Sequence, residues 1–464
     1  MIARRWLVLI LLMLSTGCRV GPNYKRPPVN TPDAYRGLAP DASPQTSASI
    51  ADEKWWTIFD DQQLQALIHK ALAQNYDVRI AATRVLEAQA QVGITRADQF
   101  PSIYGGAGAA ELHIPQTKLL NSTTTSYNRL NLSLAWELDF WGKYRRATEA
   151  ARANLLATEW GQKAVIWSLV SNLASAYFQL QELDMQIDIS KRTLASREES
   201  LRLVQVRQRG GRTSLVDVRQ SEQLVYGAAA SIPDFERRIE QQENLISILL
   251  GDNPEPILRG KSLLDTHFSP AVPAGLPSSL LERRPDVQSA EQKLVAANAQ
   301  IGVAKAAYFP NISLTALAAT QSTALTNLFT GPAGAWSFGG DLTQPIFTAG
   351  KLRSNVKLTE AQKQEAVLSY QQSIQQAFRE VSDSLIGYRK NQEFRAQEEL
   401  LAAAAQDTVR LANVRYGGGV TSYLEVLDSD TRYFDAQLAL AQAQLNERLA
   451  LVQLYNALGG GWQQ

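Results

Sequence analysis

The strongest constraint on this chain is that its sequence contains two copies of one unit. Residues 75–103 align without gaps with residues 284–312 at an offset of 209, and residues 213–218 align with residues 421–426 at an offset of 208. Two copies of one sequence are expected to fold in the same way, so a fold assigned to one half must also suit the other. We therefore expect an internally duplicated architecture.

The repeat also divides the chain into segments. We expect a first copy over residues 62–250 and a second copy over residues 278–458. Residues 251–277 lie between them and are rich in proline and glycine, which is typical of a linker. Residues 459–464 follow the second copy as a short tail.

Each copy has the same coarse order of predicted elements: a helix, two strands, a very long helix, a glycine-rich turn and another helix. Residues 143–208 contain no proline and are dominated by Ala, Leu, Gln, Glu and Arg, which favours one helix of about 100 Å. Residues 351–415 repeat this pattern. Shorter helices near residues 62–99 and 214–250 have a similar summed length of about 100 Å. The sequence therefore predicts a cylinder wall in which one long helix runs beside two stacked shorter ones.

The predicted strands have a different pattern. Between Leu130 and Phe140 every second residue is large and apolar, while the alternate residues are polar or small. One face of such a strand suits an apolar phase, and the other tolerates water. A soluble sandwich and a membrane strand of about 10 residues both fit this alternation. We expect four strands, near residues 102–114, 128–140, 311–322 and 335–347.

The N-terminus favours the membrane interpretation. Arg4 and Arg5 precede a short apolar stretch that ends in small residues. This order is typical of a secretory signal peptide, which we expect over residues 1–17. A helix that crosses a bilayer would need about 20 apolar residues, and no later stretch of the chain reaches that length.

Cys18 is the only cysteine of the chain and follows the expected signal peptide. Residues 14–18 resemble a bacterial lipobox, although Ser15 stands where a lipobox usually has leucine. In that resemblance Cys18 is acylated, residues 18–61 form a lipid-anchored extension, and Arg19 directs the protein to the outer membrane. The alternative is an ordinary secretory signal with an incidental cysteine.

The number of strands requires several copies of the chain to assemble. Four strands cannot close a barrel, and open sheet edges facing lipid would leave backbone N–H and C=O groups unpaired at several kcal/mol each. Two copies would give eight strands, a number whose interior is filled by side chains, whereas three would give twelve and leave room for a passage. The predicted fold class is therefore mainly α with β, with an internal duplication and an oligomeric barrel.

Four segments make the whole mature chain similar to the outer-membrane factor (TolC-like) family, in particular to the OprM-like and NodT-like lipoprotein branch that serves resistance-nodulation-division (RND) efflux pumps. The resemblance implies a homotrimer whose twelve-stranded barrel in outer-membrane lipid continues into a long periplasmic helical barrel. It also implies a closed tip that opens when a periplasmic adaptor protein and an inner-membrane RND-type transporter dock. The segments are CRVGPNYKRP at 18–27, WELDFWG at 136–142, RRPDV at 283–287 and LYNALGGGW at 454–462.

The same resemblance assigns roles to the two predicted helical turns. Family members contact the adaptor there, and the matching positions are Gly210, Gly211, Thr213, Ser214, Gly418, Gly419, Thr421 and Ser422. The periplasmic gate of the family matches Asp428, Tyr416 and Asp217. Thr421 stands where the family often has a basic gate residue, so the closing contacts here differ.

These acidic residues also have purely structural interpretations. Ser214 with Asp217, and Ser422 with Glu425, have the spacing of capping boxes, in which a carboxylate helps to start a helix. Asp428 would then be an ordinary solvated carboxylate near a helix start.

Other functional classes find little support in the sequence. His69, His113 and His267 are far apart and lack metal-ligand spacing, so we expect no metal site, no cofactor and no enzyme activity. A formal charge of +1 and the lack of a basic run with interleaved aromatic residues argue against a nucleic-acid partner. A periplasmic coiled-coil adaptor or tether would need only one hairpin and no apolar strands. A type I protein-secretion duct remains an alternative within the family.

Overall fold

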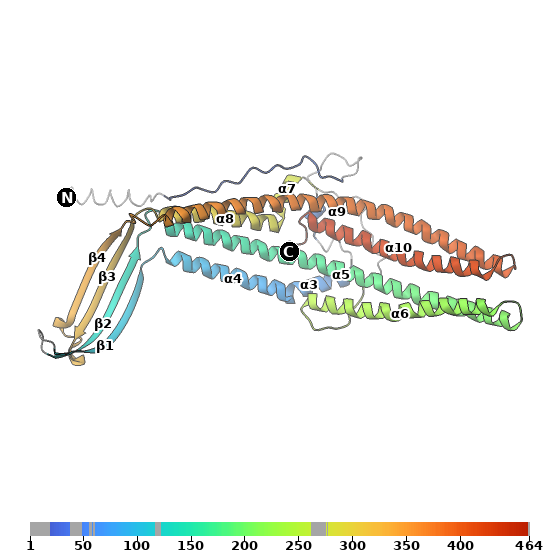
Figure 1. Cartoon of the computed structure of the whole chain (residues 1–464), viewed down its shortest axis with the longest axis horizontal. Coiled ribbons are helices and arrows are strands. Elements are labelled where there is room, and N and C mark those ends of the chain that lie inside the picture. The colour runs from blue at the N-terminus through green and yellow to red at the C-terminus, as the bar shows by residue number, and fades with distance from the viewer. Residues whose placement is uncertain are drawn as a thin grey trace. The chain divides into compact units, whose positions relative to one another are not determined.

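The computed structural model describes residues 19–37, 49–54, 58, 61–116, 122–260, 275 and 277–462 (Figure 1). The predicted signal peptide and the predicted lipidation site at Cys18 lie outside these residues. The chain divides into two compact units. Unit 1 comprises Met1–Pro28, Arg84–Glu159 and Ser289–Gln371, and unit 2 comprises Val29–Thr83, Trp160–Gln288 and Gln372–Gln464.

The order of elements repeats in the two halves of the chain. A helix, two strands, a long helix and a further helix occur as α4-β1-β2-α5-α6 and again as α8-β3-β4-α9-α10. Both long helices have 67 residues, so the two long helices predicted from the sequence are confirmed. The main elements are α3 (Gln62–Gln74), α4 (Tyr76–Ala97), β1 (Ser102–Ile114), β2 (Thr123–Glu137), α5 (Lys143–Arg209), α6 (Leu215–Leu250), α7 (Pro277–Arg283), α8 (Pro285–Ala306), β3 (Asn311–Ser322), β4 (Gly334–Thr343), α9 (Lys351–Gly417) and α10 (Tyr423–Ala457); short 3₁₀ helices are η1 (Ile50–Asp52), η2 (Leu325–Asn327) and η3 (Gly331–Ala333).

The prediction of one helix over residues 62–99 is wrong, because Asn75 separates α3 from α4. The Asn75 side-chain oxygen accepts hydrogen bonds from the backbone N–H groups of Asp77 (2.9 Å) and Val78 (3.1 Å). These donors have no partner inside α4, and a side-chain oxygen before the helix satisfies them. The polar side chain thus ends one helix and starts the next.

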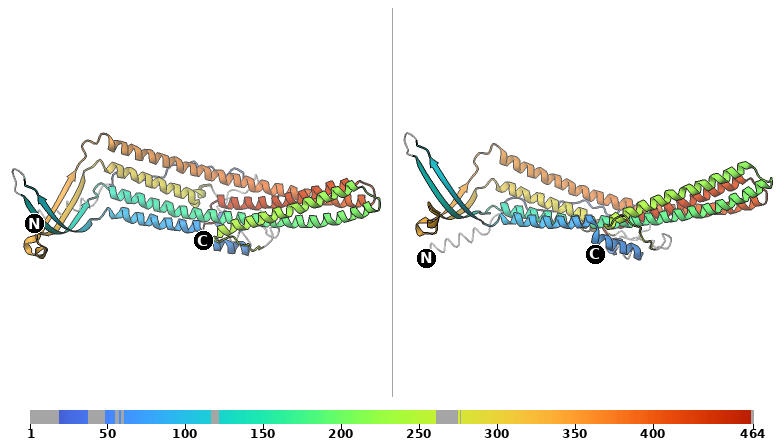
Figure 2. Two further views of the ribbon diagram at one scale, coloured as in Figure 1. Left: turned by 60° about the horizontal axis from the view of Figure 1, so that its bottom comes forward. Right: turned by 90° about the horizontal axis from the view of Figure 1, so that it is seen from below.

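The four strands of unit 1 form one antiparallel sheet in the order β1-β2-β3-β4 (Figures 1 and 2). The second strand begins at Thr123, earlier than the predicted residue 128, and ends at Glu137 rather than 140. The fourth ends at Thr343 rather than 347, just before Pro345. Proline has no backbone N–H to donate to the strand pairing, which accounts for the early end.

The sheet leaves large apolar side chains uncovered. On β4, Trp336 is 84% exposed, Phe338 is 70% exposed and Leu342 is 62% exposed, and these side chains alternate with small or polar ones. Among the described residues, no helix combines the length and the apolar character that a membrane crossing requires.

In unit 1 the N-terminal segment at residues 20–23 packs against helices α5 and α8 of the same unit. The guanidinium of Arg146, which is 1% exposed, donates hydrogen bonds to the carbonyl oxygens of Val20 (3.2 Å) and Gly21 (3.2 Å) and to the Asn23 side chain (2.8 Å). A Cβ on Gly21 would lie 2.5 Å from the Cα of Gly302, so only glycine allows this approach. The segment that follows Cys18 is therefore an integral part of the unit.

Candidate gate and docking tip

Two glycine turns form the ends of the long helices in unit 2. After α5, the N–H of Gly210 donates to Val206 O (3.1 Å), and Gly211 has a φ of +69°. After α9, the N–H of Gly418 donates to Val414 O (3.0 Å), and Gly419 has a φ of +73°. Left-handed backbone at the end of a helix favours glycine, and both turns place it there.

The capping box predicted at Ser214 and Asp217 is confirmed. The Ser214 hydroxyl accepts from the N–H of Asp217 (3.2 Å), and the Asp217 carboxylate accepts from the N–H of Ser214 (3.0 Å). The Thr213 hydroxyl also donates to this carboxylate. The hydrogen bond from Thr213 is the largest cause that lowers the pKa of Asp217, so the group stays ionised at the start of α6.

The second predicted capping box is wrong, because the side chain of Ser422 makes no capping hydrogen bond at the start of α10. The Glu425 carboxylate accepts instead from the Thr421 hydroxyl and forms an ion pair with Arg415 at 3.4 Å. The Thr421 hydroxyl thus holds a carboxylate in the first turn of α10.

Tyr416 lies in the packing between the two helical hairpins. Its ring centroid is 5.0 Å from that of Tyr423, with the rings inclined at 47°, and the Arg207 guanidinium lies 4.7 Å from its ring centre. Such a cation–π contact stabilises by about 0.5–1 kcal/mol at an exposed site. Tyr416 packs against a buried cluster made of Val204, Val218, Ala412, Tyr423, Val426 and Leu427.

Asp428 has a different environment from the other two predicted gate residues. Its carboxylate is paired with Arg432 on the next turn of the same helix at 2.8 Å, and the two side chains are 60% and 75% exposed. Asp217 caps α6, and Tyr416 packs against Tyr423. The structure of one chain therefore places the three predicted gate residues in three separate local contacts.

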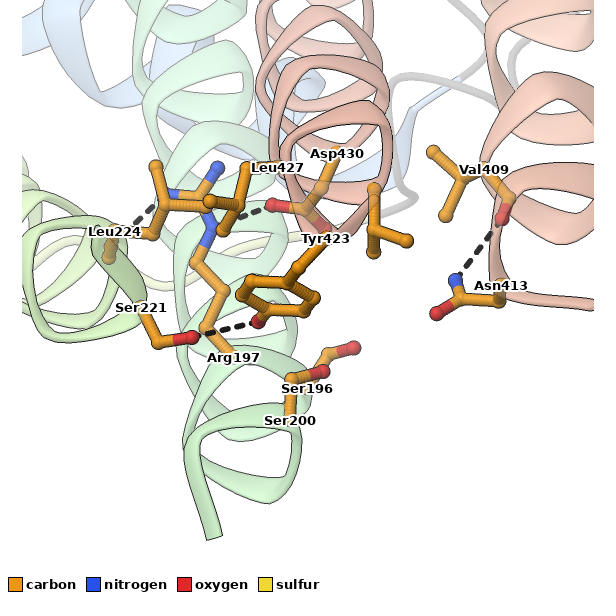
Figure 3. Close-up of a pocket in the computed structure, with 11 residues that line it drawn as sticks. Ser196, Arg197, Ser200, Ser221, Leu224, Val409, Asn413, Tyr423, Leu427 and Asp430 are labelled. Carbon is orange, nitrogen blue, oxygen red and sulfur yellow. Dashed lines mark hydrogen bonds and ion pairs between the residues drawn. The ribbon is translucent and has the colours of Figure 1, made fainter. Parts of the chain in front are cut away.

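Two side-chain pairs that the sequence analysis missed connect the two helical hairpins (Figure 3). They are Arg197 with Asp430 and Ser221 with Tyr423. The buried Arg197 of α5 donates to the Asp430 carboxylate at 2.7 Å and to Leu224 O at 3.0 Å. The Ser221 hydroxyl is 2.6 Å from the Tyr423 hydroxyl. They border a cavity of about 40 Å³, enough for a water molecule. Its lining is Ser196, Arg197, Ser200, Ser221, Leu224, Val409, Asn413, Tyr423, Val426, Leu427 and Asp430.

A sequence signal for these residues exists in the repeat itself. At the offset of 208, Arg197 corresponds to Ala405, and Tyr423 corresponds to Leu215. A charged or aromatic hydroxyl side chain in one copy and an aliphatic one in the other marks a position where the two copies have different roles. Among the described residues, no group of three His, Cys, Asp or Glu side chains is placed to hold a metal ion.

The sequence of the chain is similar to those of known proteins over nearly its whole length. Residues 67–252 and 276–460 match the family described as "Outer membrane efflux protein". The chain is 36% identical over 451 residues to the cation efflux system protein CusC of Escherichia coli O6:H1, with 97% of each chain covered. It is 40% identical over 463 residues to the solvent efflux pump outer membrane protein SrpC of Pseudomonas putida, again with 97% of each covered. The chain belongs to the outer membrane efflux protein family.

Solved structures agree with this membership. A crystal structure of CusC has a TM-score of 0.87 at 34% identity and covers 96% of this chain and 100% of its own. The open state of the MtrE outer membrane channel of Neisseria gonorrhoeae has a TM-score of 0.85 at 30% identity and covers 96% and 99%. The fold is that of outer-membrane efflux channels, which confirms the resemblance read from the sequence.

Proposed function

We propose that this protein is the exit duct of a tripartite efflux pump and works as a homotrimer. The observation that carries the proposal is the sheet, because β1 and β4 are edge strands of a four-stranded sheet with an uncovered apolar surface. Unpaired edges in lipid cost several kcal/mol per backbone group, whereas three sheets joined edge to edge form a closed twelve-stranded barrel with room for a passage.

The dimensions of the strands support membrane insertion. The four strands have 10 to 15 residues each, and a tilted strand of about 10 residues spans the apolar core of a bilayer. We place this barrel in the outer membrane, with Cys18 acylated as an additional anchor and the helices extending into the periplasm.

The partners we propose are a periplasmic adaptor protein and an inner-membrane RND-type transporter. The adaptor would contact the two glycine turns, which leave Val216, Val420 and Leu424 between 60% and 73% exposed. The proposed contacts are Gly210, Gly211, Thr213, Ser214, Gly418, Gly419, Thr421 and Ser422. Small molecules are the proposed cargo, and the transporter selects them, since a passive tunnel discriminates only by width and charge.

We propose that Asp428, Tyr416 and Asp217 belong to the gate at this tip. The exposed carboxylate of Asp428 supports its assignment, because three copies around an axis would form a ring of three carboxylates, each beside its own Arg432. Asp217 and Tyr416 would hold the helices of the gate in place. Asp217 fixes the start of α6, and Tyr416 packs between the hairpins.

Conductance across a planar bilayer tests the proposal. The purified mature chain should insert and form discrete, uniform conductance steps, and the addition of the cognate adaptor should raise their size or lifetime. A periplasmic tether would leave the bilayer sealed, and that outcome would overturn the duct assignment.

A further inference from the structure

A cavity of about 330 Å³ lies in unit 1 where the strands meet the helices. Ligand-binding cavities in proteins typically begin at about 300 Å³, so this one is large enough for a small polar group. Its lining residues come from the end of β2, the start of β3 and the end of β4. In Figure 1 these strand ends lie at the helical end of the sheet, opposite the β3–β4 connection. Its lining includes Glu137, Asp139, Trp141, Lys143, Phe309 and Pro345.

An aromatic pair forms one wall of this cavity. The rings of Trp141 and Phe309 are stacked with their centroids 4.7 Å apart, and the Trp141 indole N–H donates to Pro310 O at 2.8 Å. Tryptophan with a satisfied N–H and an apolar ring is typical of the boundary between lipid and water. The pair therefore places the cavity at the depth of the lipid headgroups in the proposed membrane orientation.

Charges of both signs surround the cavity. The Lys143 ammonium is 3.0 Å from a Glu137 carboxylate oxygen, and their side chains are 40% and 27% exposed. Arg145 is paired with the lining residue Asp139 at 3.2 Å. Two carboxylates and two cations leave no excess charge, so the surroundings match a zwitterionic group better than an anion.

An apolar surface follows the cavity along the chain. Pro345 lines the cavity, and the next two residues, Ile346 and Phe347, are 90% and 87% exposed. Leu342, shortly before it on β4, is 62% exposed. A lipid whose headgroup occupied the cavity would find an apolar surface for its acyl chains beside it.

We propose that this cavity binds the headgroup of a phosphoethanolamine phospholipid from the inner leaflet of the outer membrane. The lipid phosphate lies next to the Lys143 ammonium, and the lipid amine lies next to the Glu137 carboxylate. The headgroup dipole is therefore antiparallel to the dipole of the Lys143–Glu137 ion pair. The inference rests on the proposed insertion of the sheet into the outer membrane. The bound lipid would fix the depth of the strand–helix junction in the bilayer.

Lipid binding to purified trimers tests the proposal. Delipidated trimers are titrated with phosphatidylethanolamine, phosphatidylglycerol or diacylglycerol in detergent, and bound lipids are counted by native mass spectrometry. We expect selective retention of phosphatidylethanolamine, weakened about tenfold by Lys143→Gln, because the charge-assisted bond to phosphate is lost. Ala307→Trp, which fills the cavity without changing its charge, should have the same effect.

Lys351→Gln is the matched control, because Lys351 begins α9 as Lys143 begins α5 but does not line the cavity. Equal loss in this control, equal binding of phosphatidylglycerol, or no retained lipid on wild-type trimers would overturn the inference. Bilayer conductance is recorded on the same samples. Conducting trimers that retain no lipid would refute the lipid site alone, whereas protein that never conducts would refute the duct.

Discussion

At the scale of single residues, two carboxylates of unit 2 illustrate opposite environments. Asp428 is exposed, and its carboxylate is paired with Arg432 on its own helix. Glu182 of α5 is 2% exposed, and one of its carboxylate oxygens has no hydrogen-bond partner. Exposure suits the role proposed for Asp428 in the gate, where its carboxylate would face the tunnel. Burial of an ionised Glu182 instead lowers the stability of the folded state.

Asp428→Ala should increase the single-channel conductance of isolated trimers, because it removes negative charge and bulk from the proposed gate. The change should leave the unfolding free energy within about 0.5 kcal/mol, since the lost ion pair is exposed. The measurement is conductance in a planar bilayer, with the exposed Asp435→Asn on the same helix as the control. An unchanged conductance would count against a gate at Asp428.

Glu182→Gln should stabilise the protein at pH 8 and have little effect at pH 4.5. Burial raises the pKa of Glu182 to about 7 against the attraction of Arg238 and the hydrogen bond from Gln186. The folded state therefore favours the neutral acid, and stability is lost as the pH rises from the ordinary pKa of 4.5 to about 7. We expect a gain of about 2 kcal/mol at pH 8.

Thermal unfolding of both proteins in detergent at the two pH values checks this expectation. The matched control is Glu198→Gln, an exposed position on the same helix. A gain of equal size at both pH values, or the same gain in the control, would show that the burial of the Glu182 charge is not the cause.

At the scale of elements, the helices and turns were largely predictable and the contacts between them were not. The absence of proline from 143–208 and the box at Ser214 are local signals, and both predictions are confirmed. The break at Asn75 depends on a single side chain within a helix-favouring run. At Ser422 the N–H of Glu425 donates to the backbone carbonyl oxygen of Ser422 at 3.3 Å instead of to its hydroxyl. The Glu425 carboxylate is held by Arg415 and Thr421. Arg197 meets Asp430 only through tertiary packing.

The N-terminal segment should depend on Arg146. Arg146→Ala removes the donors for Val20 O and Gly21 O and leaves Glu149 without one partner. Loss of a buried charged donor costs about 3 kcal/mol, so the midpoint of thermal unfolding should fall and proteolysis near residues 19–26 should accelerate.

Limited proteolysis followed by mass spectrometry of the N-terminal peptides checks this, with Arg152→Ala at an exposed position of α5 as the control. If the Arg146 variant were cleaved no faster than the control, the segment would not be held by this side chain.

At the scale of the whole molecule, the proposed assembly follows from the duplication and from a sheet that leaves two edge strands unpaired. Each copy supplies two strands, and in the part of the chain that the structure describes these make one four-stranded sheet whose edge strands are β1 and β4. The duplicated fold could be read from the sequence because the repeat offset and the strand alternation are properties of the chain itself, whereas the family was read from the resemblance of four short segments. The closing contacts of the proposed gate could not be predicted, because in the proposed trimer they would depend on residues of the neighbouring copies.

The mass of the detergent-solubilised mature protein tests the central claim most directly. Native mass spectrometry of protein extracted from outer membranes should give three copies of the chain, stable without heating and dependent on detergent for solubility. A monomer that remains soluble in water without detergent would contradict the account, because its sheet would then need neither lipid nor a second copy.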